Sequence, residues 1–136
     1  DMFDGVWYAK YSMGPVSIGY SESYLDQGTT GSAEAITTAK AVRTAGGFFE
    51  SESMSIAFNV NDNLSISYTE TEDTYDAQDN AATAIADVTM TTDAIQVAYS
   101  MGAMSIKAYN MDTKNNGYDS DVGDTSSTEI ALGLSF

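Results

Sequence analysis

The amino-acid sequence predicts an all-β fold, and within that class an antiparallel transmembrane β-barrel. Three observations support this prediction. Apolar residues recur at every second position in seven stretches, which is the spacing of side chains that share one face of a strand. The connections between these stretches alternate between tight turns and long polar segments. Aromatic residues recur on the apolar face close to the tight turns.

The first two strands are expected at residues 3–12 and 16–25. Trp7 and Tyr11 share one face of the first strand, and Lys10 lies on the other face. Gly14 and Pro15 lie between the two stretches, and both residue types favour tight turns. The apolar face continues at alternate positions of the second stretch. The two strands therefore form a hairpin.

The next two strands are expected at residues 47–60 and 64–71, joined by the turn Asn61-Asp62-Asn63. Methionine, isoleucine and phenylalanine alternate with serine and alanine in the first of them. In the preceding connection, residues 33–42 could form a short helix that ends at Gly46-Gly47. After residue 71 the sequence is polar up to about residue 87, which predicts a long loop.

The last three strands are expected at residues 88–100, 104–111 and 128–136. The hairpin between the first two repeats the earlier one, because Tyr99-Ser100-Met101-Gly102 matches Tyr11-Ser12-Met13-Gly14. In the closing stretch, Ile130, Leu132, Leu134 and Phe136 share one face. A closing strand that ends on phenylalanine resembles the C-terminal signal of bacterial outer-membrane proteins.

The two faces differ in a way that separates a barrel from a soluble sheet. A water-exposed sheet face is usually rich in charged residues, whereas the polar face here is made of small residues with few charges. We expect this face to line a water-filled lumen. The predicted pore-lining residues are Lys10, Ser17, Ser55, Ser65, Gln96, Lys107 and Glu129. The predicted lipid-facing aromatic girdle is Tyr11, Phe58, Tyr99 and Phe136.

The competing interpretation is a soluble sheet or sandwich, in which large residues such as Trp7, Ile18, Phe58, Val97 and Leu134 would meet in a dry interior. Lys10 and Lys107 also have two interpretations. They either bias the ions inside the lumen or are wall residues with no measurable role.

Composition excludes several functions. The chain has 5 Lys+Arg and 20 Asp+Glu, a net charge of −15, so binding to nucleic acid is not expected. It contains no His and no Cys, which removes catalytic triads, thiolate chemistry and disulfides. No apolar run is long enough for a transmembrane helix. Glu50 and Glu52 share one strand face that is expected to lack a sugar cleft, so we predict no glycosidase and no enzyme.

Acidic residues in the long connections offer one possible metal site. Asp119, Asp121 and Asp124 surround a glycine, and carboxylate oxygens suit Ca²⁺. The alternative is a solvated loop tip without metal. No other cofactor is expected. Such loops could also bridge to lipopolysaccharide phosphates through divalent cations.

The strand count carries a further expectation. Seven strands place the two ends of the chain at opposite rims, whereas a complete bacterial barrel has an even number of strands and both ends on the periplasmic side. We therefore expect the sequence to cover the closing strands of a larger barrel.

The Tyr-Ser-Met-Gly hairpins and the terminal Ala131-Leu132-Gly133-Leu134-Ser135-Phe136 resemble the C-terminal portion of a Gram-negative general porin of the alphaproteobacterial type. This resemblance implies that residues 1–136 are part of one barrel of sixteen strands in a homotrimer. It also implies an outer-membrane channel for passive diffusion of small hydrophilic solutes and ions. The alternative function is an acidic secreted β-domain or adhesin that binds calcium or a surface ligand through its loops.

Overall fold

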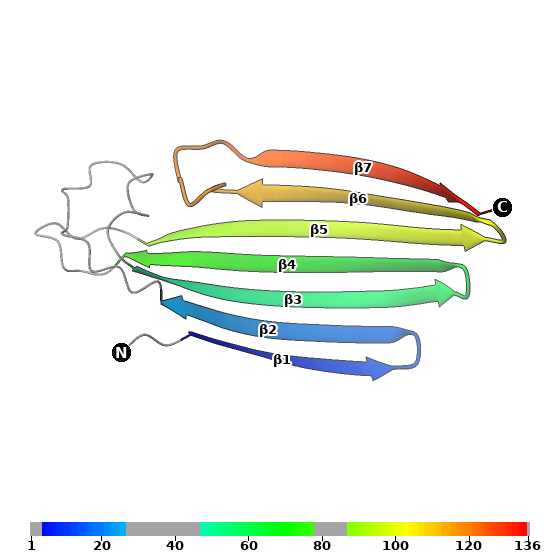
Figure 1. Ribbon diagram of the computed structural model, residues 1–136, viewed down its shortest axis with the longest axis horizontal. Helices are drawn as coiled ribbons and strands as arrows, with labels where there is room; N and C mark the ends of the chain where they lie inside the picture. The colour runs from blue at the N-terminus through cyan, green and yellow to red at the C-terminus, as the bar shows by residue number, and fades with distance from the viewer. Residues whose placement is uncertain (1–3, 27–46, 78–86, 136) are drawn as a thin grey trace, which may run out of the picture.

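The computed structural model describes residues 4–26, 47–77 and 87–135, which form one antiparallel sheet of seven strands (Figure 1). The strands follow one another in sequence order across the sheet. They are β1 (Asp4–Met13), β2 (Val16–Asp26), β3 (Gly47–Asn61), β4 (Leu64–Ala77), β5 (Val88–Met101), β6 (Met104–Lys114) and β7 (Thr125–Leu134). The described residues contain no helix, which confirms the all-β prediction.

All seven predicted strands are present, and those ends that meet at tight turns lie within one residue of prediction. At the opposite end of the sheet, three strands extend three residues or more beyond the prediction. β4 continues to Ala77 and β6 to Lys114, and β7 begins at Thr125. These extensions are polar on both faces, so hydrophobic alternation does not reveal them although the backbone ladder continues. The possible helix at residues 33–42 and the girdle residue Phe136 lie outside the described residues.

Three tight turns lie at one end of the sheet, which we call the tight-turn end; the opposite end is the long-loop end (Figure 1). Gly14 and Gly102 each occupy the first central position of a two-residue turn, with φ of 58° and 57°. Such a turn matches the twist of the flanking strands. The turn after Asn61 differs, because the Asn61 side chain accepts hydrogen bonds from the backbone N–H groups of Asn63 and Leu64.

Strand register assigns the side chains to two faces. Tyr11, Ile18 and Ile56 lie opposite one another on what we call the apolar face. Lys10, Gly19 and Ser55 lie opposite one another on the small-residue face. Directly paired residues of an antiparallel sheet point to the same side, so the assignment follows across all seven strands.

The apolar face has no second layer among the described residues. The only buried hydrophobic residues of the described ranges, Tyr75 and Val88, lie on the small-residue face. Trp7 is 50% exposed, Phe58 43% and Leu134 63%. These large side chains therefore do not meet in a dry interior within the described part of the chain, as a soluble sandwich would require.

The hairpins are displaced regularly along the sheet. The row of paired residues through Val16, where the first hairpin closes, reaches β4 at Ile66. The second hairpin closes at Leu64, two residues farther along β4 towards the tight-turn end. The row through Leu64 meets Tyr99, two residues before the third turn begins at Met101. Figure 1 shows this displacement of successive turns. One residue per strand, at about 3.3 Å per residue and 4.8 Å between strands, corresponds to a strand tilt of about 35°.

Candidate functional site

The seven residues predicted to line a pore all lie on the small-residue face. Lys10 belongs to the row of Ser55, and Ser17 to the row of Gln96 and Glu129. Ser65 and Lys107 share the next row towards the tight turns. Register therefore brings all seven residues together on one wall.

The small-residue face is the inner side of a curved sheet. In β3, the small residues Ser53, Ser55 and Ala57 are half-buried, whereas Met54, Ile56 and Phe58 on the other face are exposed. A flat sheet would expose both faces equally, so smaller residues that are less exposed indicate the concave side. A shallow hollow of about 380 Å³ on this face is lined by Ser67, Gln96, Lys107, Tyr109 and Glu129, among others.

Lys10 and Lys107 lie at the same distance from the tight-turn end. Lys10 is three residues before Met13, the end of β1, and Lys107 is three residues after Met104, the start of β6. Neither faces a carboxylate directly across the ladder, because Lys10 is opposite Gly19 and Lys107 lies between two alanines. The structure thus places two positive charges at one level of the concave wall.

Glu129 brings the opposite charge to the same wall. Tyr109 on the neighbouring strand donates a hydrogen bond of 3.1 Å to its carboxylate. The bond fixes the side chain within the row that also contains Gln96.

The three predicted girdle residues that the structure describes, Tyr11, Phe58 and Tyr99, lie on the apolar face at a common level. Tyr11 and Tyr99 are each two residues before a tight turn begins, and Phe58 is three residues before the end of β3, where a bulge between Asn59 and Asn61 adds one residue. Tyr11 is exposed and lies two residues from the end of β1 at the tight turns.

A second aromatic level, absent from the sequence prediction, lies farther from the tight turns. Trp7 Nε1 donates to Glu22 at 2.8 Å, and the Tyr20 hydroxyl donates to Glu22 at 2.6 Å. The Tyr68 hydroxyl donates to Glu70 at 3.0 Å and to Asp93 at 2.5 Å. The signal was present as two Tyr-x-Glu triplets, 20–22 and 68–70, because that spacing puts both side chains on one face.

These aromatic residues border an apolar band on the apolar face. The band spans five residues of β2, Val16–Tyr20, and seven of β3, Met54–Val60, which corresponds to about 14–19 Å in height at 3.3 Å per residue and the tilt given above. Beyond this band the same face becomes acidic. Its carboxylates are Glu22, Asp26, Glu50, Glu52, Glu70, Glu72, Asp76, Asp93 and Asp112.

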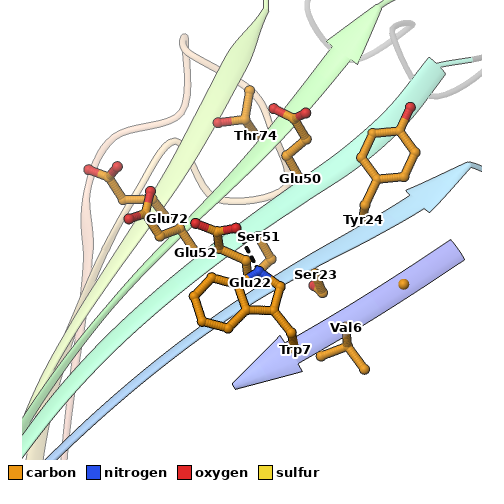
Figure 2. A pocket seen from close by; sticks show the side chains of 11 residues that line it. Val6, Trp7, Glu22, Ser23, Tyr24, Glu50, Ser51, Glu52, Glu72 and Thr74 are labelled. Atoms are coloured by element: carbon orange, nitrogen blue, oxygen red, sulfur yellow. Dashed lines mark hydrogen bonds between the residues drawn. The ribbon is translucent and has the colours of Figure 1, made fainter. Parts of the chain in front are cut away.

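The acidic part of the apolar face contains an open hollow of about 610 Å³ (Figure 2). Figure 2 shows Glu22, Glu52 and Glu72, which come from three neighbouring strands, with Trp7 beside them. Glu50 and Glu52, for which the sequence predicts no sugar cleft, both line this open hollow. The hollow forms because long acidic side chains and Trp7 stand at the edge of an uncovered face.

The loop aspartates do not assemble as a metal site would require. Asp119 accepts a 3.0 Å hydrogen bond from the backbone N–H of Asp121, which closes a local turn. In residues 4–26, 47–77 and 87–135, no group of three or more Asp, Glu, His or Cys side chains is arranged to hold a metal ion. The calcium prediction for Asp119, Asp121 and Asp124 therefore gains no support from the geometry.

An aromatic cluster occupies the small-residue face at the long-loop end. The rings of Phe49 and Tyr75 are 4.8 Å apart, and Tyr118 packs against both at 5.2 and 6.2 Å. Tyr75 is only 2% exposed. Burial, together with the neighbouring Asp76 charge, raises the pKa of the Tyr75 hydroxyl above its ordinary value.

Two further findings concern membrane-spanning helices and similarity to known proteins. Within the described ranges, no helix combines the length and the apolar character that crossing a bilayer would demand. No family model, curated protein or solved structure matches the chain significantly.

Proposed function

We propose that the chain forms part of a transmembrane β-barrel in the outer membrane of a Gram-negative bacterium. The barrel is a water-filled channel through which small hydrophilic solutes and ions diffuse passively. The apolar face contacts lipid, and the small-residue face lines the lumen. The tight turns lie on the periplasmic side and the long loops outside, where they meet lipopolysaccharide.

The observation that carries this proposal is the uncovered apolar face. Ile18, Ile56 and Val97 are between 38% and 45% exposed although they are among the most hydrophobic residues of the sheet. In water such a continuous surface would aggregate, since soluble proteins rarely expose apolar patches beyond a few hundred Å². Hydrocarbon removes this cost because the apolar side chains then have apolar neighbours.

The borders of the apolar band support the same orientation. Tyrosine and tryptophan favour membrane interfaces because their rings are apolar and their polar tips need hydrogen-bond partners. Tyr20, Tyr68 and Trp7 satisfy both needs, with rings at the band and polar atoms bound to carboxylates beyond it. The band of about 14–19 Å is lower than the roughly 25 Å typical of outer-membrane barrels.

The sheet edges indicate that further strands complete the barrel. β1 and β7 are not paired with each other, and almost every residue of both is exposed. Long regular edges of this kind promote unwanted pairing unless another strand covers them. Additional strands that pair with β1 and β7 would close the barrel, and the porin resemblance sets the expected total at sixteen, in a homotrimer.

The direct test is channel formation by the purified protein. We expect it to require detergent for extraction and to produce stepwise, ohmic conductance in planar lipid bilayers. Vesicles that contain it should release small sugars but retain a large dextran. A protein that stays soluble without detergent and leaves bilayers electrically silent would refute the channel and favour the secreted binding domain.

A further inference from the structure

The connection between β6 and β7 reaches across the sheet instead of continuing outward. Tyr118 lies in this connection, residues 115–124, yet its ring contacts Phe49 of β3 and Tyr75 of β4. β5 separates β6 from β4 in the sheet, so the connection must pass over β5 to make these contacts. Both partner rings lie on the small-residue face, in the row that joins Leu25, Phe49, Tyr75 and Val88.

The crossing is fixed by local backbone geometry. Asn115, Gly117 and Tyr118 have φ values of 50°, 73° and 60°, which reverse the chain sharply. The Tyr118 N–H donates to the Asn115 carbonyl at 2.9 Å, and the Asn115 side chain donates to the Thr89 carbonyl of β5 at 2.8 Å. A left-handed tyrosine costs about 1–2 kcal/mol, so the contacts of its ring must offset that cost.

The contact lies at the outer end of the proposed lumen. Tyr75 is eleven residues along β4 from Leu64 at the tight-turn end, which corresponds to a height of about 30 Å at the tilt given above. This level lies seven residues, or about 19 Å, beyond Tyr68, which borders the apolar band on the same strand. The aspartates that follow Tyr118 are therefore held beside the outer mouth.

We propose that residues 115–124 form a fixed lid that narrows the outer mouth of the channel and that Tyr118 is the residue that fastens it. The lid places Asp119, Asp121 and Asp124 at the entrance, where their charge enriches cations and repels anions. This inference rests on the proposed channel function. It assigns to the loop aspartates a role in ion selection without any bound metal.

The first experiment compares Tyr118→Ala with Tyr118→Phe in planar bilayers. The alanine variant loses the ring that holds the lid, so we expect single-channel conductance to rise about 1.5-fold and larger sugars to enter vesicles faster. The phenylalanine variant keeps the ring and should match the unmodified channel. Channels that form normally but conduct equally in both variants would overturn the lid, while the channel proposal would stand.

The second experiment separates the charge of the lid from its position. Combined replacement of Asp119, Asp121 and Asp124 by Asn keeps Tyr118 in place and removes three negative charges. We expect unchanged conductance at high salt and about twofold lower cation preference, read from the reversal potential in a salt gradient. An unaltered reversal potential would remove the selective role of the aspartates.

A third measurement remains informative if Tyr118→Ala does not fold. The sequence contains no Cys, so a single introduced thiol can be labelled selectively. Val88 is 8% exposed and lies beside Tyr75, so a thiol at this position shows whether the lid covers it. With Tyr118 unchanged, we expect an impermeant maleimide added from outside to label this thiol at least about tenfold more slowly than one at Ser23, on the same face of β2. Equal labelling rates would refute the lid.

Discussion

At the scale of single residues, the backbone conformation that a turn glycine adopts can be tested separately from the room available for a side chain. A Cβ added at Gly102 or at Gly123 would meet no atom within 4 Å. Of these two glycines, only Gly102 has a left-handed φ, of 57°. We predict that Gly102→Ala lowers the free energy of unfolding by about 1–2 kcal/mol, because an L-residue in that conformation brings Cβ close to its own backbone.

Gly123→Ala is the matched control and should change stability by less than about 0.5 kcal/mol. Urea unfolding of the lipid-reconstituted protein, followed by tryptophan fluorescence, measures both variants. Equal losses in the two variants would show that the turn conformation of Gly102 does not matter for stability.

Two wall lysines make a second prediction at this scale. Lys10 and Lys107 lie at one level of the small-residue face, and neither has a carboxylate directly opposite. Replacement of both by Ser removes two positive charges from the lumen and should raise the cation-to-anion permeability ratio about twofold. The reversal potential in a salt gradient measures this ratio.

Lys114→Ser is the control for the wall lysines, because Lys114 is exposed and lies on the opposite face, in the row of Thr91. It makes the same kind of charge change outside the lumen. A reversal potential that is unmoved by the double replacement would leave Lys10 and Lys107 as wall residues without a selective role.

At the scale of elements, the sequence was informative wherever one face is apolar. Alternation in β3 identified the strand and both of its faces from residues such as Ile56 and Ser55. It failed in the outer half of β4, where Glu72, Asp73 and Thr74 are polar on both faces although β4 remains paired with β3 and β5. There backbone hydrogen bonds extend the strand, but the side chains show no alternation of apolar and polar residues from which it could be predicted.

The aromatic cluster could not be predicted for a related reason. Tyr75 and Tyr118 are single aromatic residues in polar sequence, and their contact depends on a connection that crosses a neighbouring strand. The amino-acid composition of the connection would be the same whether it returned directly to β7 or crossed β5 first. The structure was needed because the crossing depends on three left-handed backbone conformations, at Asn115, Gly117 and Tyr118.

The assignment of the two faces yields a prediction with a built-in control. Ile56 lies within the apolar band, paired with Ile18 and Tyr68, whereas Ser55 beside it lies on the small-residue face between Gly19 and Thr69. A lysine that faces the centre of a bilayer costs about 2–4 kcal/mol in a β-barrel. We therefore predict that Ile56→Lys destabilises the lipid-reconstituted protein by that amount.

Ser55→Lys should cost less than about 1 kcal/mol, because its ammonium group would remain in lumen water. Urea unfolding in lipid vesicles compares the pair. Equal costs would mean that the two faces see the same solvent, and the reverse order would place water on the apolar face and exchange the roles of the two sides.

At the scale of the whole molecule, one number connects the register to the architecture. Each hairpin is displaced by two residues relative to the one before it, and always in the same direction. A flat sheet of this kind would have a slanted edge. If the sheet curves so that the turns lie at one height, the strands must tilt by about 35° from the barrel axis.

That tilt also explains why the apolar band moves along the strands. Its outer border lies at Tyr20 in β2, at Tyr68 in β4 and at Ala108 in β6. Each of these residues is four positions from the tight-turn end of its strand. Counted from the turns, the border therefore stays level, as a planar membrane surface requires.

The strand direction in a bilayer is therefore predictable. In oriented lipid films, polarised infrared spectroscopy of the amide I band should give a mean strand tilt of about 35–45° from the bilayer normal. This range follows from the register of seven strands and does not depend on how many strands complete the barrel. Strands that lie in the plane of the film would contradict the proposed barrel, because such strands do not cross the bilayer.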